Sequence, residues 1–108
     1  MTEQTRDILI TGASLLGGEP TDIALSGGTI VAIGADARNN VRDPRVIVAE
    51  GLIALPGLVD IHTHLRQPGG EDAETVFTGT RAAAVGGYTA VHAMANTTPT
   101  QDTAAIVD

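Results

Sequence analysis

Apolar and polar positions alternate in short runs through the first half of the chain. Residues 22–26 alternate with the period of two that is expected for a half-buried strand. Gly27-Gly28 separates this run from the apolar run 29–33, and two such glycines predict a hairpin because both turn positions take positive φ. With the β-branched or aliphatic runs 8–10 and 46–48, this pattern predicts a meander of antiparallel strands.

The pattern changes in the second half. Residues 58–64 begin with a nearly continuous apolar run, which is typical of a strand in a parallel sheet covered on both faces. Residues 71–75 are acidic and rich in capping residues, so they favour a helix start, and the helix should continue over 76–85 until Gly86-Gly87 ends it. Another strand is expected over 88–94. Strand, helix and strand in this order predict a right-handed parallel βαβ unit.

These two patterns predict two parts, residues 1–55 and residues 56–108. Two parallel strands with one crossover cannot close a barrel or cover both of their edges. A helix that should begin near Thr103 is also interrupted at Asp108. We therefore expect the chain to be the N-terminal part of a longer polypeptide. The alternative is a stand-alone β-rich binding module, which would have to fold cooperatively by itself.

Composition narrows the classes of function. Lys and Arg number 6 against 13 Asp and Glu, which gives a formal charge of −7, so a nucleic-acid or anionic-membrane surface is not expected. With no Cys and only 3 His, any metal must be held by His, Asp or Glu. The apolar run 52–61 is too short and too interrupted to span a bilayer. The polar N-terminus does not resemble a secretory signal, so the expected compartment is the cytoplasm.

The candidate chemistry centres on His62 and His64. Their i, i+2 spacing on a strand places both imidazoles on one face, within reach of a single ion. They lie at the carboxyl end of the predicted strand, where α/β barrels place their active sites, and Asp60 on the same face could orient a ring. The alternative is a histidine pair that fills a core or lies at a polar loop edge.

Three segments resemble one known family. Residues 57–69, with Asp-Ile-His-Thr-His-Leu-Arg at their centre, resemble the opening signature of metal-dependent amidohydrolases and are most similar to dihydroorotases. Residues 86–91 and the Met-x-Asn-Thr-x-Pro segment 94–99 match the same family. The N-terminal strands resemble its small flanking β-sandwich. The resemblance implies an α/β fold, the start of a (β/α)8 TIM-like metallohydrolase barrel preceded by part of that β-sandwich.

The resemblance also implies roles for individual residues. His62 and His64 would be metal ligands, and His64, Arg66 and Asn96 would contact the substrate, with Arg66 and Asn96 holding its carboxylate. Without the resemblance, Arg66 would be an ordinary loop cation and Asn96 a loop residue in a left-handed turn. His92 is expected to be a packed, hydrogen-bonded core residue. Gln67 stands where many relatives have Glu, and it is given no catalytic role.

The implied reaction is the reversible, zinc-dependent cyclisation of N-carbamoyl-L-aspartate to dihydroorotate in pyrimidine biosynthesis. The family completes a binuclear zinc site with a carboxylated Lys and further His, and it uses an Asp as general acid/base. All of these are expected beyond Asp108, so no catalytic residue is expected within residues 1–108. The alternatives are an allantoinase-like or hydantoinase-like cyclic amidohydrolase, or an inactive scaffold subunit. The resemblance also implies a homo-oligomer or an association with aspartate transcarbamoylase.

Overall fold

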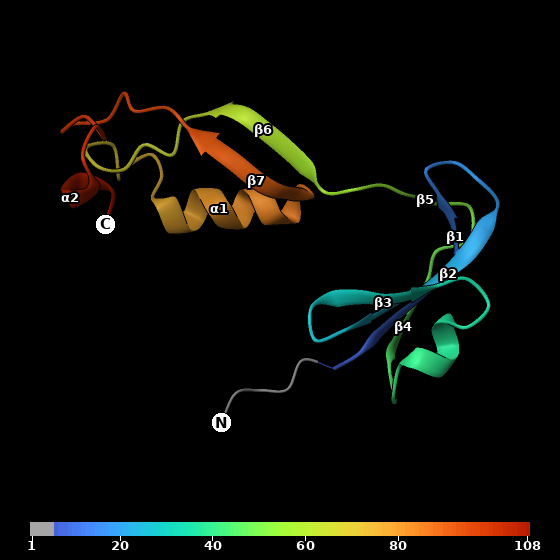
Figure 1. Ribbon diagram of the computed structural model, residues 1–108. Coiled ribbons are helices and arrows are strands. Elements are labelled where there is room, and N and C mark those ends of the chain that lie inside the picture. The colour runs from blue at the N-terminus through green and yellow to red at the C-terminus, as the bar shows by residue number, and fades with distance from the viewer. Residues whose placement is uncertain (1–5) are drawn as a thin grey trace. The chain divides into compact units, whose positions relative to one another are not determined.

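The computed structural model describes residues 6–108, which divide into two compact units, one ending at Leu55 and the other starting at Pro56 (Figure 1). The first unit contains five strands and a short 3-10 helix, and the second contains two strands and two helices. In chain order the elements of the first unit are β1 (Ile8–Leu15), β2 (Pro20–Ser26), β3 (Thr29–Ile33), η1 (Ala37–Asn40), β4 (Arg45–Val48) and β5 (Ile53–Ala54). Those of the second unit are β6 (Leu58–Thr63), α1 (Val76–Val85), β7 (Tyr88–Ala93) and α2 (Ala104–Val107).

The first unit is a mixed sheet, not the antiparallel meander that the sequence pattern predicted. The strand order is β3-β2-β1-β4, and β5 pairs with β1 as well. β1 with β2 and β2 with β3 are antiparallel, as expected, but β4 and β5 both run parallel to β1. The hairpin between β2 and β3 turns at Gly27 and Gly28, whose φ angles are 59° and 79°. The predicted hairpin is therefore confirmed, and the predicted direction of the later strands is wrong.

Polar contacts around the start of β1 hold β4 in its parallel position. The Arg45 N–H donates to the Asp7 carbonyl at 2.7 Å, and the Arg42 N–H donates to Asp7 Oδ2 at 2.8 Å. Arg6 forms an ion pair with Asp43 at 3.0 Å. The backbone N–H of Arg42, followed by the Ser26 hydroxyl, lowers the pKa of the Asp7 carboxyl below its ordinary value. These contacts fix the loop before β4 beside the first residues of β1.

One buried hydrophobic cluster of the first unit lies between its sheet and η1. Leu9, Ala24 and Ala37 are fully buried and cluster together, and Ala32 and Val41 pack against them. The paired positions Leu9 and Ala24 bring β1 and β2 into this core. Small alanine side chains let η1 approach the sheet closely, so a short helix is sufficient to cover Leu9.

The second unit is the parallel βαβ unit that the sequence predicted. β6 and β7 pair in parallel, with α1 as the crossover helix between them. Thr75 is the N-cap of α1, and its hydroxyl forms a reciprocal capping box with Thr78. The helix covers the predicted residues 76–85, so this prediction is confirmed. The acidic residues Glu71, Asp72 and Glu74 precede the helix, and its first turn contains none.

Apolar side chains of the second unit are largely exposed. Ile61 on β6 is 75% exposed and Val85 on α1 is 91% exposed. Among the described residues of this unit, Gly79 alone is buried. No helix in the described part of the chain is long and apolar enough to cross a membrane.

Candidate metal and substrate site

The two predicted metal ligands meet at the carboxyl end of β6. His62 is the second-to-last residue of β6, and His64 is the first residue beyond the strand. Their ring centroids are 5.1 Å apart, with the ring planes inclined at 61°. The structure therefore brings both imidazoles together, although the register of β6 against β7 is irregular between Asp60 and Thr63. The site does not depend on a perfectly regular strand.

Backbone hydrogen bonds join the loops that follow β6 and β7. The Met94 N–H donates to the Thr63 carbonyl at 2.7 Å, and the Thr98 N–H donates to the Pro68 carbonyl at 3.0 Å. The two bonds lie on either side of Asn96 along the chain. Because both strands are parallel and end at the same edge, their loops can pair in this way. Two segments that are about 30 residues apart in the sequence are thus held side by side.

Gly69 allows the closest approach of these loops. Its φ is +97°, and a Cβ at this position would lie 2.6 Å from the Thr98 carbonyl oxygen. Both the backbone angle and the contact exclude a side chain. The glycine thus permits the hydrogen bond between the Thr98 N–H and the Pro68 carbonyl.

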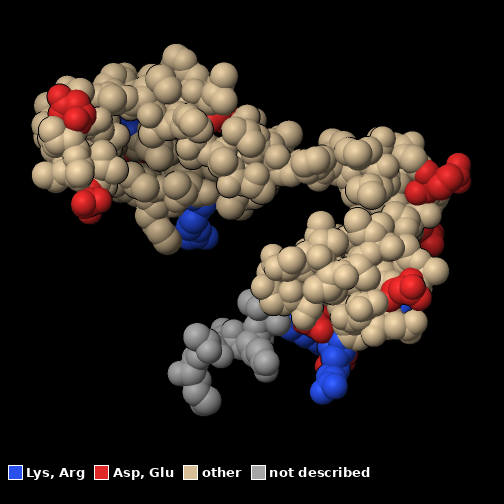
Figure 2. Space-filling model, in the orientation of Figure 1, with Lys and Arg blue, Asp and Glu red and all other residues tan. Residues whose placement is uncertain are grey.

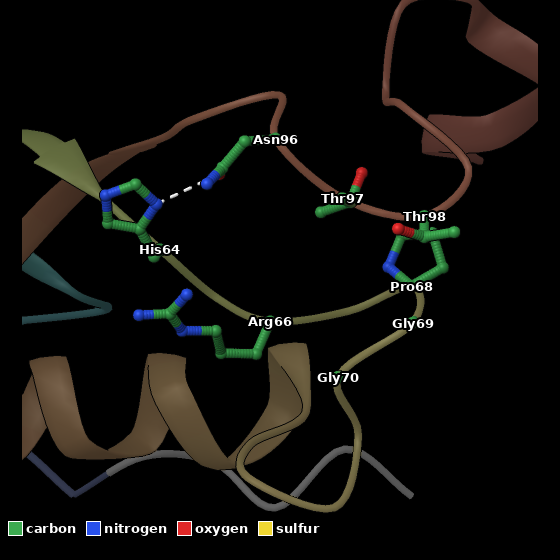
Figure 3. Close-up of a pocket in the computed structure, with 8 residues that line it drawn as sticks. All are labelled: His64, Arg66, Pro68, Gly69, Gly70, Asn96, Thr97 and Thr98. Carbon is green, nitrogen blue, oxygen red and sulfur yellow. Dashed lines mark hydrogen bonds between the residues drawn. The ribbon is translucent and has the colours of Figure 1, made fainter.

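A cavity of about 170 Å³ opens between the joined loops (Figure 3). Three of its lining residues are the predicted substrate contacts His64, Arg66 and Asn96. The other lining residues are Pro68, Gly69, Gly70, Thr97 and Thr98. The structure therefore places the three predicted contacts around one space.

Arg66 has an uncommon backbone conformation. Its φ is 60°, in the left-handed region that costs an L-residue about 1–2 kcal/mol. The left-handed turn considered for Asn96 is therefore found at Arg66 instead, since Asn96 is not among the positive-φ residues. In Figure 3 the Arg66 side chain turns back toward the His64 end of the cavity. Strain of this kind is common where a side chain must be aimed at a ligand.

Arg66 carries a positive charge that no described carboxylate neutralises. The ion pair found among residues 6–108 is Arg6 with Asp43, in the other unit. The other arginine of the second unit, Arg81, lies with its guanidinium 5.6 Å from the Phe77 ring centre on α1. On the face shown in Figure 2, acidic side chains are spread over both units and few basic side chains are visible. The guanidinium of Arg66 can therefore bind an anionic group in the cavity.

His64 and Asn96 are joined by a side-chain hydrogen bond. His64 Nδ1 lies 2.9 Å from Asn96 Oδ1, and an amide oxygen can only accept, so the imidazole donates its Nδ1–H. Nε2 of His64 then keeps its lone pair, which is the form that binds a divalent metal. With His62 beside it, the donor set fits two nitrogen ligands of a zinc-type ion. Residues 6–108 contain no group of three or more potential metal ligands.

Asp60 does not orient either imidazole ring. Its Oδ1 accepts a hydrogen bond from the backbone N–H of His62 at 3.0 Å. Asp60 thus stabilises the end of β6 through the backbone.

Asp60 also lines a second space of about 270 Å³ between the β6–β7 sheet and α1, together with Glu74 and Tyr88. Thr63 lines the same space, and its buried hydroxyl oxygen has no hydrogen-bond partner among the described residues.

Two further polar residues, Gln67 and His92, have surroundings that the sequence did not predict. Gln67 Oε1 accepts the backbone N–H of Val76 at 2.7 Å, so it caps the first turn of α1 from nine residues away. Gln101 in turn donates from Nε2 to the Gln67 carbonyl at 2.9 Å. His92 is exposed in the described residues, so the prediction that it is packed is wrong here. The backbone N–H groups at the start of a helix need acceptors from outside the helix. No local sequence pattern identified Gln67 as the acceptor for the Val76 N–H.

The sequence of this chain is similar to those of known proteins. A family described as "Dihydro-orotase-like" matches residues 51–107. The dihydroorotase of Streptomyces coelicolor is 56% identical over 100 residues, covering 93% of this chain and 23% of that protein. The chain spans about a quarter of the length of the curated relatives it matches.

Two solved structures are also similar. The dihydropyrimidinase of Brevibacillus agri NCHU1002 has a TM-score of 0.66 and 35% identity, covering 82% of this chain and 20% of that one. The L-hydantoinase of Arthrobacter aurescens has a TM-score of 0.65 and 28% identity, covering 92% of this chain and 23% of that one.

Proposed function

Because the chain belongs to the dihydroorotase-like family, we propose that it forms part of a dihydroorotase. The reaction is the reversible cyclisation of N-carbamoyl-L-aspartate to dihydroorotate, a step of pyrimidine biosynthesis. One observation carries the proposal beyond the family: a cation without a described carboxylate partner, Arg66, shares a cavity with His64 and Asn96. Both the substrate and the product of this reaction are small carboxylates.

The two units have separate places in the proposed architecture. Residues 56–108 begin a (β/α)8 barrel, and residues 1–55 supply part of a flanking β-sandwich. The parallel pairing of β6 with β7 and the exposed apolar residues Val59 and Ile61 support the first assignment. A barrel of this type needs roughly 250 residues, in accord with relatives about four times as long as this chain.

Arg66 and Asn96 bind the substrate carboxylate in this proposal. A guanidinium presents two parallel N–H donors to a carboxylate, and the Asn96 amide adds a neutral donor. Arg66 lies two residues after His64, so the carboxylate is held close to the metal ligands. The cavity of about 170 Å³ leaves room for this end of the substrate.

His62 and His64 would hold a zinc ion. When bound, such an ion lowers the pKa of water and polarises a carbonyl oxygen. Catalytic zinc normally has three protein ligands, so a binuclear site draws its other ligands from outside residues 1–108. The general acid/base Asp is also proposed to lie there, and no catalytic residue is assigned within this chain. Cytoplasmic location, self-association and binding to aspartate transcarbamoylase stay predictions.

A second candidate function has support from the structural comparisons. The dihydropyrimidinase and the L-hydantoinase share this fold, and a hydantoinase-like enzyme would act on a ring without a carboxylate. An inactive scaffold subunit would retain the fold and turn over neither type of ring. The charge of Arg66 favours the acidic substrate.

The test compares dihydroorotate with dihydrouracil, which is the same ring without the carboxylate, on the full-length enzyme. We expect hydrolysis of dihydroorotate to be strongly preferred. Arg66→Met should lower kcat/KM for dihydroorotate by about 100-fold, mainly through KM, because loss of a charged partner costs about 3 kcal/mol. Arg81→Met is the matched control and should leave both kcat and KM for dihydroorotate unchanged.

Preference for dihydrouracil would favour the hydantoinase-like function instead. Failure to hydrolyse either ring would favour the scaffold. An Arg66→Met enzyme with wild-type KM would contradict the assigned substrate contact.

A further inference from the structure

The hydrogen bond between His64 and Asn96 assigns a second role to Asn96. A neutral imidazole can carry its proton on either nitrogen, and only the unprotonated nitrogen has a lone pair for a metal. Asn96 Oδ1 at 2.9 Å from His64 Nδ1 stabilises the tautomer with the proton on Nδ1. Metal-binding histidines commonly need such a partner to fix the ring and its tautomer.

The backbone around Asn96 holds this partner in place. The Met94 N–H bonds to the Thr63 carbonyl on one side of Asn96, and the Thr98 N–H bonds to the Pro68 carbonyl on the other. Both acceptors belong to the segment that carries His64. The relative position of the two side chains is therefore set by the main chain, which makes a persistent hydrogen bond possible without other contacts.

The two ends of the Asn96 amide have different surroundings. Oδ1 is engaged by His64, whereas Nδ2 has no protein hydrogen-bond partner among the described residues. Asn96 shares the cavity with Arg66, so Nδ2 can donate to the carboxylate that Arg66 binds. An amide oriented by His64 thus presents its N–H donors, and not its oxygen, to an anion.

We propose that Asn96 is a positioning residue for the metal, acting through the tautomer of His64, as well as a substrate contact. The substrate contact rests on the proposed function, because that function identifies the substrate whose carboxylate Asn96 would bind. The positioning role itself depends only on His64 and zinc. Replacing the amide by a carboxylate separates the roles, because Asp keeps the acceptor and loses the donor.

The experiment uses the full-length enzyme and measures zinc affinity by chelator competition without substrate. Asn96→Ala should bind zinc about 10–100-fold more weakly, the usual effect of removing such a partner. Asn96→Asp should bind zinc at least as tightly as the wild type but should have a raised KM for dihydroorotate. Arg66→Met is the matched control, with unchanged zinc affinity and a raised KM.

Nitrogen-15 NMR of the zinc-free enzyme gives the second measurement. The wild type and Asn96→Asp should show His64 with its proton on Nδ1, and Asn96→Ala should show protonation of Nε2. If Asn96→Ala does not fold, as judged by circular dichroism, the isosteric Asp variant and the wild-type tautomer still decide the question.

Wild-type zinc affinity in Asn96→Ala, equal zinc loss in the Ala and Asp variants, or a wild-type His64 protonated on Nε2 would each overturn the positioning role. These readouts need no substrate. Failure of dihydroorotate hydrolysis with the expected zinc and NMR results would therefore overturn the proposed function alone.

Discussion

The two units of the chain differ in what holds them together. All the buried hydrophobic residues of the described chain belong to the first unit, and none of the predicted site residues does. The second unit contains the site, yet its apolar side chains on β6, α1 and β7 are largely exposed. Its site is organised by hydrogen bonds between loops and by the Gln67 cap on α1. Core packing and site construction are thus carried by different segments of one short chain.

Among the described residues, hydrogen bonds and not buried apolar side chains position the site. Backbone hydrogen bonds between the ends of parallel strands fix the distance between His64 and Asn96. Apolar packing, which is non-directional, would not by itself specify that distance. Substitutions at the cavity-lining side chains of the second unit should therefore mainly affect activity, whereas substitutions in the buried core of the first unit should mainly affect folding stability.

The largest effect should come from His62→Ala in the full-length enzyme. Loss of a metal ligand should reduce kcat by about 1,000-fold or more, since a metal contributes several kcal/mol to catalysis. Metal content should fall in parallel, measured by elemental analysis. His92→Ala is the matched control, because it removes the same imidazole from β7 and the proposal gives His92 no contact with metal or substrate. Equal activity in the two variants would remove His62 from the site.

Leu9→Ala should affect stability and not activity. Leu9 is fully buried, and truncation of a buried leucine costs about 3 kcal/mol. Chemical denaturation of the full-length protein measures the loss, and KM for dihydroorotate should not change. Ile61→Ala should cost a similar amount if the proposed barrel covers β6. A negligible cost at Ile61 would contradict that proposal.

Gly69→Ala should affect both properties. At φ +97° a side chain is strained, and its Cβ would also collide with the Thr98 carbonyl, so we expect a loss of about 2 kcal/mol and a raised KM. Gly34→Ala is the matched control in the first unit: its φ is +101° and no atom lies within 4 Å of the added Cβ. This control should cost about 1 kcal/mol and leave KM unchanged. Equal effects would show that the close approach of the loops is unimportant.

The smallest effect should come from Gln67. Gln67→Ala removes the cap on the Val76 N–H and should cost about 1 kcal/mol in chemical denaturation. Gln67→Glu should instead stabilise by about 0.5 kcal/mol, because a carboxylate interacts favourably with a helix N-terminus. Destabilisation by Glu comparable to that by Ala would contradict the capping role.

Local signals predicted most elements of the chain, but they did not predict η1 or β5. Gly27-Gly28 predicted the hairpin, and the capping residues with Gly86-Gly87 predicted α1. Direction was harder to predict for β4, since a short β-branched run can pair either way. Its parallel pairing depends on contacts from Arg42 and Arg45 to Asp7, more than 30 residues away. No local pattern contains that information.

The sequence by itself determined the division into two units, the βαβ order of the second unit, and the His-x-His pair that indicates a metal site. Tertiary structure alone decided that Asn96 bonds to His64, that Arg66 adopts the left-handed conformation, and that Gln67 caps α1. Spacing along a strand determines which residues share a face, because the backbone repeats every two residues. Which side chains meet across two loops depends on where the parallel strands end, and pairing sets that over long distances along the chain.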